Sequence, residues 1–135
     1  MAEDEGRARF LRDRVMTATP AQRVVMLYDR LGLDLTLAES TEDVADYGTH
    51  LSHALDVLAN LQGSLNLSAG GPAGNLAALY SYVMMELIAA RGGDRGRIDG
   101  VRSIMAGLRS AWAQVAEDAA VVTSPSRAVA GSWVS

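Results

Sequence analysis

Asp46, His50 and His53 have the only spacing in the chain that suits metal binding. A helix would place these side chains on roughly one face, because they lie at positions i, i+4 and i+7. They also lie opposite an apolar stripe that contains Leu51 and is expected to face the core, so a solvated polar face explains them better. The Glu-x-x-His pairs that a di-iron bundle requires are missing from the sequence. We therefore expect no metal site and no cofactor.

Motifs for nucleophilic catalysis and phosphate binding are also missing. The chain has no cysteine and no G-x-S-x-G elbow. Glycine-rich residues 70–74 precede a predicted helix, but they follow another helix rather than a strand and contain no lysine. All 12 basic residues are arginine. A pocket of arginines could bind a carboxylate substrate, yet these residues fall mainly in the N-terminal segment, at helix ends and on the back of the last helix. We do not expect an enzyme.

Composition narrows the class of protein further. A chain of 135 residues with 49% hydrophobic and 21% charged residues suits one globular domain. The charged start and the lack of any apolar run near the roughly 20 residues of a membrane span predict a cytoplasmic protein without membrane insertion. A net charge of −4 and a pI near 5.0 give no electrostatic reason to bind nucleic acid.

Helical spacing of apolar residues dominates the sequence and predicts four helices, over about 20–39, 42–66, 75–91 and 95–118. Thr19 is the expected cap of the first helix, because Pro20 suits the first helical position. Gly92 and Gly93 are expected to stop the third. The predicted core stripes are Val24, Leu27, Tyr28, Leu31, Leu35 and Ala38; then Val44, Tyr47, Leu51, Leu55, Leu58 and Leu65; then Leu76, Leu79, Tyr80, Val83, Leu87 and Ala90; and finally Ile98, Val101, Met105, Leu108, Trp112 and Val115.

Short connections make consecutive helices antiparallel neighbours, so we predict an all-α, up-down four-helix bundle over residues 19–118. Residues 1–18 form an N-terminal segment that is either mobile or docked on the bundle. Residues 119–135 are small, contain serine and proline, and lack a period, which predicts a flexible C-terminal tail. Trp133 is an apolar exception in that tail.

Two helices carry more apolar surface than a bundle can bury. The first helix has a second stripe of Met26, Leu33 and Leu37, about half a turn from the first. The third helix has only Glu86 and Arg91 as charges, and Ala77, Met84, Met85 and Ile88 widen its apolar area. Each bundle helix has an outer side, so the surplus must be covered by a tail, a second copy or another protein, unless the third helix is central and buried all round.

Several spaced segments together resemble the FliS family of flagellar export chaperones. The resemblance covers about residues 10–117 in the family's order, with Phe10 in place of the usual tyrosine, Ala69 in place of a glycine and Arg91 in place of an asparagine. The matching segments are Val15-Met16-Thr17-Ala18-Thr19-Pro20, Val24-Val25-Met26-Leu27-Tyr28-Asp29, Leu61 to Leu65, Ala69-Gly70, Ala73-Gly74-Asn75-Leu76, Leu79-Tyr80-Ser81-Tyr82, Leu87 to Ala90, and Leu108-Arg109-Ser110-Ala111-Trp112.

This resemblance implies an antiparallel helical bundle that binds the disordered C-terminal segment of flagellin in the cytoplasm. Such binding would prevent premature polymerisation and keep flagellin competent for flagellar type III secretion. It also implies contacts with components of the export apparatus. In the family the N-terminal segment can cover part of the binding surface, and Phe10, Val15 and Met16 are the matching candidates for such a plug.

The candidate partner-binding residues combine the plug with the surplus apolar positions, because core and groove positions share one composition. They are Phe10, Val15, Met16, Met26, Leu33, Leu37, Leu61, Leu65, Leu76, Tyr80, Met84 and Ile88. Two other readings remain open: a helical homodimeric adaptor without flagellin binding, and a bundle enzyme or metal protein. The protein itself is expected to be a monomer or a weak homodimer.

Overall fold

The computed structural model describes residues 5–9, 18–66 and 71–121. Its four long helices are α2 (Pro20–Ser40), α3 (Val44–Gly63), α4 (Ala73–Arg91) and α5 (Arg97–Val121). Residues 5–9 form a short helical segment with exposed side chains. The predicted all-α class is therefore confirmed, and the four predicted helices are all present.

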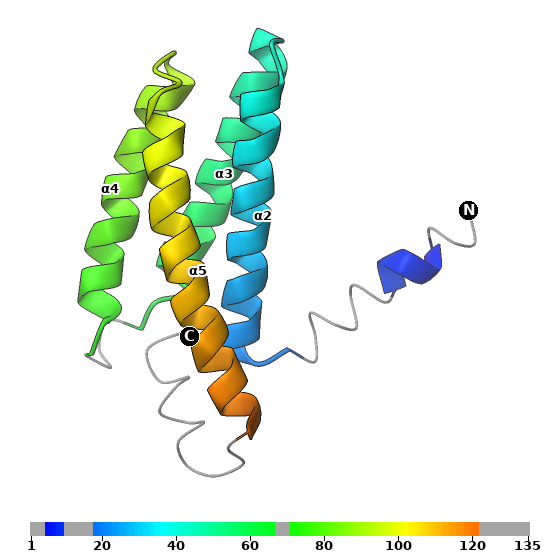
Figure 1. Ribbon diagram of the computed structural model, residues 1–135, viewed down its shortest axis with the longest axis vertical. Coiled ribbons are helices and arrows are strands. Elements are labelled where there is room, and N and C mark those ends of the chain that lie inside the picture. Colours follow the sequence, from blue (N-terminus) through cyan, green and yellow to red (C-terminus); the bar gives the residue numbers. More distant parts are fainter. Residues whose placement is uncertain (1–4, 10–17, 67–70, 122–135) are drawn as a thin grey trace.

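The helices form a bundle in which each packs against the next along the chain, and α5 closes the ring against α2 (Figure 1). Helices α2 and α4 are thus diagonal partners, as are α3 and α5. Packing between α4 and α5 is the least extensive of the four seams. This is the up-down arrangement that the short connections predicted.

The start of α2 follows its sequence signals. The hydroxyl of Thr19 accepts a hydrogen bond from the Gln22 backbone N–H at 3.2 Å, and the Gln22 side chain accepts one from the Thr19 N–H at 2.9 Å. This reciprocal capping box, followed by Pro20, satisfies donors that would otherwise lack a partner at the helix end. The predicted cap is confirmed.

Several helix ends differ from the prediction: α4 starts two residues earlier than expected, at Ala73, and α5 ends three residues later, at Val121. Helix α3 begins at Val44 rather than Glu42, because the Asp43 carboxylate caps it by accepting from the Asp46 N–H at 2.9 Å. Val44 was wrongly assigned to the core stripe: it is 83% exposed in the first turn of the helix. Helix α3 also stops at Gly63, so Leu65 lies beyond its end, and α5 starts two residues later than expected.

The core runs the length of the bundle and takes residues from all four helices. Its largest fully buried side chains are Tyr80, Leu31, Leu35, Leu51, Leu58, Leu61, Leu87, Ile98, Val83, Val101 and Asp34. Among the described residues, α4 alone has the length and hydropathy of a membrane-crossing helix, a weak signal that core helices share. Its apolar inner face contributes Tyr80, Val83 and Leu87 to this core.

Gly92 and Gly93 end helix α4, as the sequence predicted. Helix α4 ends at Arg91, and the N–H of Gly92 donates to the carbonyl oxygen of Ile88. Gly93 has φ of 125°, a conformation that side-chain-bearing residues rarely adopt. Beside this turn, the Arg95 guanidinium lies 3.9 Å from the centre of the Tyr47 ring, and the Tyr47 hydroxyl donates to the Ala90 carbonyl at 2.6 Å.

Candidate protein-binding surface

A buried polar cluster joins three helices at the centre of the bundle. The hydroxyls of Tyr28 in α2 and Tyr80 in α4 share a hydrogen bond across the diagonal. The Trp112 side chain from α5 is a further hydrogen-bond partner of both hydroxyls. Tyr28 and Tyr80 are 3% and 1% exposed. Burial, above all, raises the pKa of each phenol, and the hydrogen bond to Tyr80 raises that of Tyr28 further.

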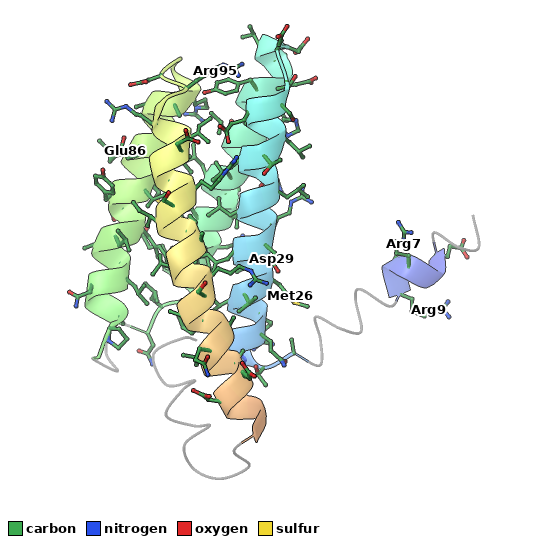
Figure 2. The ribbon with its side chains drawn as sticks, in the orientation of Figure 1. Arg7, Arg9, Met26, Asp29, Glu86 and Arg95 are labelled. Atoms are coloured by element: carbon green, nitrogen blue, oxygen red, sulfur yellow. The ribbon has the colours of Figure 1, made fainter. Side chains whose placement is uncertain are left out.

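Among the described residues, side chains do not fill the seam between α2 and α5 completely. A cavity of about 320 Å³ opens near the start of α2, and we call it the seam cavity. Its lining residues are Ala18, Gln22, Val25, Met26 and Asp29 from the α2 side and Arg109, Ala113 and Ala116 from α5. Figure 2 shows Met26 and Asp29 on neighbouring turns of α2, beside α5. A second hollow of about 170 Å³ lies further along the same seam.

An ion pair stands where these two hollows meet. Arg109 Nε donates to Asp29 Oδ1 at 2.5 Å, and Arg109 Nη2 donates to Asp29 Oδ2 at 3.3 Å. Both side chains line both hollows. The hydrogen bonds to Asp29 raise the pKa of Arg109, which keeps this guanidinium charged. The seam therefore combines small and apolar side chains with Gln22, Arg102 and a fixed pair of opposite charges.

The second stripe of α2 lies away from the core, on the outer face of the helix. Leu33 and Leu37 are 47% and 36% exposed, and Met26 is half-buried at the edge of the seam cavity. On α4, Met85 is 68% and Ile88 47% exposed. The surplus apolar surface expected from the sequence is therefore present outside the core of a single chain.

Other candidate positions lie inside the bundle. Leu61, Leu76 and Tyr80 are buried, at 1%, 8% and 1% exposure, and pack in the core. Leu65 and Met84 are half-buried and pack against that core. Phe10, Val15 and Met16, the expected plug, lie outside the described residues. The structure thus groups Met26, Leu33 and Leu37 on one outer face and separates them from the core members of the set.

The family described as flagellar protein FliS matches residues 4–119 of the chain. The chain belongs to the FliS family. A comparison with curated proteins finds no significant match. The FliS match starts before α2 and ends inside the last turn of α5, so residues 120–135 lie outside it.

The motifs that resemble FliS segments meet in space. Tyr28 and Asp29 come from the segment Val24–Asp29, Tyr80 from Leu79–Tyr82, and Arg109 and Trp112 from Leu108–Trp112. The aromatic members form the buried polar cluster, and the charged members form the ion pair beside the seam cavity. In this FliS-family chain the motifs therefore fix how α2, α4 and α5 sit against one another, which sets the shape of the seam.

His53, one of the three residues with metal-like spacing, contacts a carboxylate of α2 in this FliS-family bundle. His53 Nδ1 lies 2.5 Å from Oδ2 of Asp34, whose side chain is only 1% exposed, and Arg30 Nε lies 3.6 Å from Oδ1 of the same carboxylate. Among the described residues, no group of three His, Cys, Asp or Glu side chains could hold a metal ion. Sequence reasoning missed Asp34, although its place beside Leu31, Leu35 and the other core positions of that helix was a usable signal.

A third hollow lies on the outside of α3. It is shallow, about 590 Å³, and small residues such as Gly48 and Ser52 line it together with His53 and Arg91. Arg91 Nη1 donates to Ser52 Oγ at 3.2 Å across its floor. No large apolar side chain other than Val44 lines this surface, so it offers little area for burial of a partner.

Proposed function

We propose that this FliS-family protein is a cytoplasmic export chaperone that binds the disordered C-terminal segment of flagellin. Binding would hide the segment, prevent premature polymerisation and keep flagellin competent for flagellar type III secretion. The role is one of binding, without catalysis. Components of the export apparatus are further partners on this proposal, since a chaperone must deliver its cargo to them.

One observation carries the proposal: large apolar side chains remain exposed on the outer faces of two bundle helices. Leu33 and Leu37 on α2 and Met85 and Ile88 on α4 are each more than a third exposed. Soluble monomers rarely expose contiguous apolar patches unless the patch binds something. A disordered segment that folds onto such faces buries its own apolar residues, while the cost of ordering keeps the complex reversible.

The proposal predicts where cargo binding is sensitive. Isothermal titration of the full chain with a peptide of the flagellin C-terminal segment should give saturable binding. Changing Leu33 and Leu37 together to glutamate should weaken that binding at least tenfold, because both apolar contacts would be lost and charges would be placed in the interface. Neither change should unfold the bundle, since both side chains already contact solvent.

Val44→Glu is the matched control, because Val44 is also an exposed apolar residue but lies at the start of α3, away from α2's outer face. Its binding should equal that of the unchanged protein. Failure of the folded, unchanged protein to bind the peptide would contradict the proposal.

An alternative is a homodimeric adaptor whose exposed faces pack against a second copy. Sedimentation would favour it by showing a tight dimer that excludes the peptide.

A further inference from the structure

The outer face of α2 carries positive charge as well as apolar surface. Arg23 and Arg30 lie two helical turns apart, and Met26 and Leu33 repeat the same separation three residues further along. Leu37 extends the apolar row by one turn. The five residues follow one another at alternating steps of three and four, which places them along one side of the helix. We call them the α2 outer stripe, and each of them is exposed or half-buried.

The carboxylates of α2 do not neutralise this stripe, because each is bonded to a side chain of a neighbouring helix. The pairs are Asp29 with Arg109, Asp34 with His53, and Glu39 with Arg102. The stripe makes one contact with them, at 3.6 Å between Arg30 Nε and Asp34 Oδ1. The Asp34 carboxylate lies beneath the surface, and the Arg30 side chain is still 51% exposed. Arg30 therefore keeps donors that face solvent.

Arg23 is the less compensated of the two arginines. Among the described residues, its side chain has no hydrogen-bond or ion-pair partner. The other arginines between residues 71 and 121 each donate to an oxygen atom of another residue. They are Arg91, Arg95, Arg97, Arg102 and Arg109. The two arginines of the bundle with the fewest bonds thus lie on the same face as the exposed Leu33 and Leu37.

This arrangement favours a helical partner that carries acidic residues. A helix lying along α2 presents its residues at the same steps of three and four, so its apolar side chains can meet Met26, Leu33 and Leu37. The positions between them then meet Arg23 and Arg30. Carboxylates there would accept charge-assisted hydrogen bonds from the two guanidinium groups. Basic residues would bring like charges together, and a wholly apolar helix would remove water from the arginines without replacing it.

The net charge of the whole chain acts in the opposite direction. The chain carries −4, so its distant charges repel an acidic partner. At physiological ionic strength the screening length is about 8 Å, which weakens those distant charges far more than a charge in direct contact. The preference of the stripe is therefore a short-range effect that depends on Arg23 and Arg30.

We propose that the α2 outer stripe recognises an amphipathic helical segment in which carboxylates alternate with apolar residues, and that Arg23 and Arg30 determine this specificity. The identification of that segment with part of the flagellin cargo rests on the proposed function, whereas its acidic character does not. On this proposal the apolar residues of the stripe supply buried area, and the arginines select the partner and fix its register along α2.

Two designed peptides test the charge preference without reference to flagellin. Both are about 20 residues long and carry the same leucines at steps of three and four. They differ only at the positions between the leucines, which are glutamate in one peptide and lysine in the other. Titration calorimetry of the full chain at about 0.15 M salt should show the glutamate peptide binding at least tenfold more tightly. Equal affinities, tighter binding of the lysine peptide, or binding of neither peptide would overturn the proposal.

Substitutions assign the preference to the stripe. Arg23→Gln combined with Arg30→Gln should weaken binding of the glutamate peptide about three- to tenfold, because two partly exposed ion pairs are lost. Arg91→Gln combined with Arg97→Gln removes the same charge beside α4 and should change this binding less than twofold. Equal losses in the two double variants would overturn the proposal.

A single substitution covers the case in which the double variant does not fold. Arg30→Gln also removes a contact with the buried Asp34, so urea denaturation of the double variant checks its stability. Arg23→Glu leaves that contact intact and places an acidic residue near the start of α2, where the helix dipole favours it. This variant should lower the affinity for the glutamate peptide and raise that for the lysine peptide. Unchanged affinities for both peptides would contradict the role of Arg23.

The flagellin peptide separates this inference from the proposed function. Weaker binding of that peptide to the Arg23→Gln, Arg30→Gln variant supports both. Unchanged binding overturns the inference and leaves the proposed cargo in place. If the glutamate peptide binds and the flagellin peptide does not, the cargo is wrong and the inference stands.

Two further results would show a different occupant of the stripe. If the Arg23→Gln, Arg30→Gln variant binds the glutamate peptide more tightly than the unchanged protein, acidic residues of the chain itself cover the stripe, and the proposal is wrong. If the same variant loses self-association in sedimentation without any change in peptide binding, the stripe binds a second copy, and the proposal is wrong as well.

Discussion

Tyr28 and Tyr80 share a hydrogen bond between diagonal helices of the bundle, although 52 residues separate them in the sequence. Here a polar contact with defined geometry also fixes the rotation of α2 and α4 about their axes. The same pair is hydrogen-bonded to Trp112 of α5, so three helices are held in one register.

This contact predicts strong coupling between two substitutions. Tyr28→Phe and Tyr80→Phe should each lower the free energy of unfolding by about 1–2 kcal/mol, because each leaves a buried hydroxyl with fewer partners. The double variant should cost less than the sum of the two, since removing both hydroxyls leaves neither of them unsatisfied. Urea denaturation of the four proteins measures the coupling. Strict additivity would show that the hydroxyls do not depend on each other.

Alkaline pH should destabilise the bundle through the same two residues. Burial raises the pKa of Tyr28 and Tyr80 in the folded state, while unfolded tyrosine titrates near 10. Their contribution is therefore complete below about pH 10 and is lost as pH rises toward the folded pKa values, because the unfolded chain releases the protons first. Urea unfolding between pH 8 and 11 should show this decline. The variant with phenylalanine at both positions should decline less steeply.

The Asp34–His53 pair predicts an asymmetry between its two partners. His53→Ala should cost about 1–3 kcal/mol, because it leaves the buried Asp34 carboxylate with only the more distant Arg30. Asp34→Leu should cost less than His53→Ala, because it removes the buried carboxylate itself and leaves His53, whose side chain is 43% exposed, in contact with water. Thermal unfolding of both variants shows which substitution lowers the stability of the bundle more. A greater loss for Asp34→Leu would show that the pair itself stabilises the α2–α3 seam.

The cap of α2 should have a measurable effect. Thr19→Ala removes the side-chain acceptor of the Gln22 N–H and should cost about 1 kcal/mol. Thr49→Ala is the control, because Thr49 is also an exposed threonine and its hydroxyl bonds back to Ala45 within α3. That change should be close to neutral. Equal losses in the two variants, measured by urea denaturation, would contradict the capping role.

The two exposed apolar faces need not contribute equally to cargo binding. Leu33 lies on α2, which also lines the seam cavity, whereas Met85 is an exposed residue of α4, the helix that packs least extensively against α5. Leu33→Ser should weaken binding of the flagellin peptide about tenfold, and Met85→Ser less than threefold, if cargo centres on α2. Titration calorimetry of the two variants distinguishes them. The opposite order would move the centre of the cargo site to α4.

The sequence by itself determined the number of helices, their order and their inner faces, because the spacing of apolar residues reports directly on which side of a helix is buried. It also determined the Thr19 cap and the glycine stop after α4, since these depend on residues only a few positions apart. The presence of apolar surface beyond the core followed from the same periodicity. The FliS motifs were visible as well.

Only the tertiary structure decided how those faces meet. Leu61 and Leu33 are the same residue type on equally regular helices, yet one is in the core and the other is half exposed, because burial depends on the rotation of each helix toward its neighbours. The pairing of Asp34 with His53 and the hollow between α2 and α5 likewise depend on inter-helix geometry. Helical periodicity assigns residues to faces, but distances between helices are set by packing of side chains far apart in the chain.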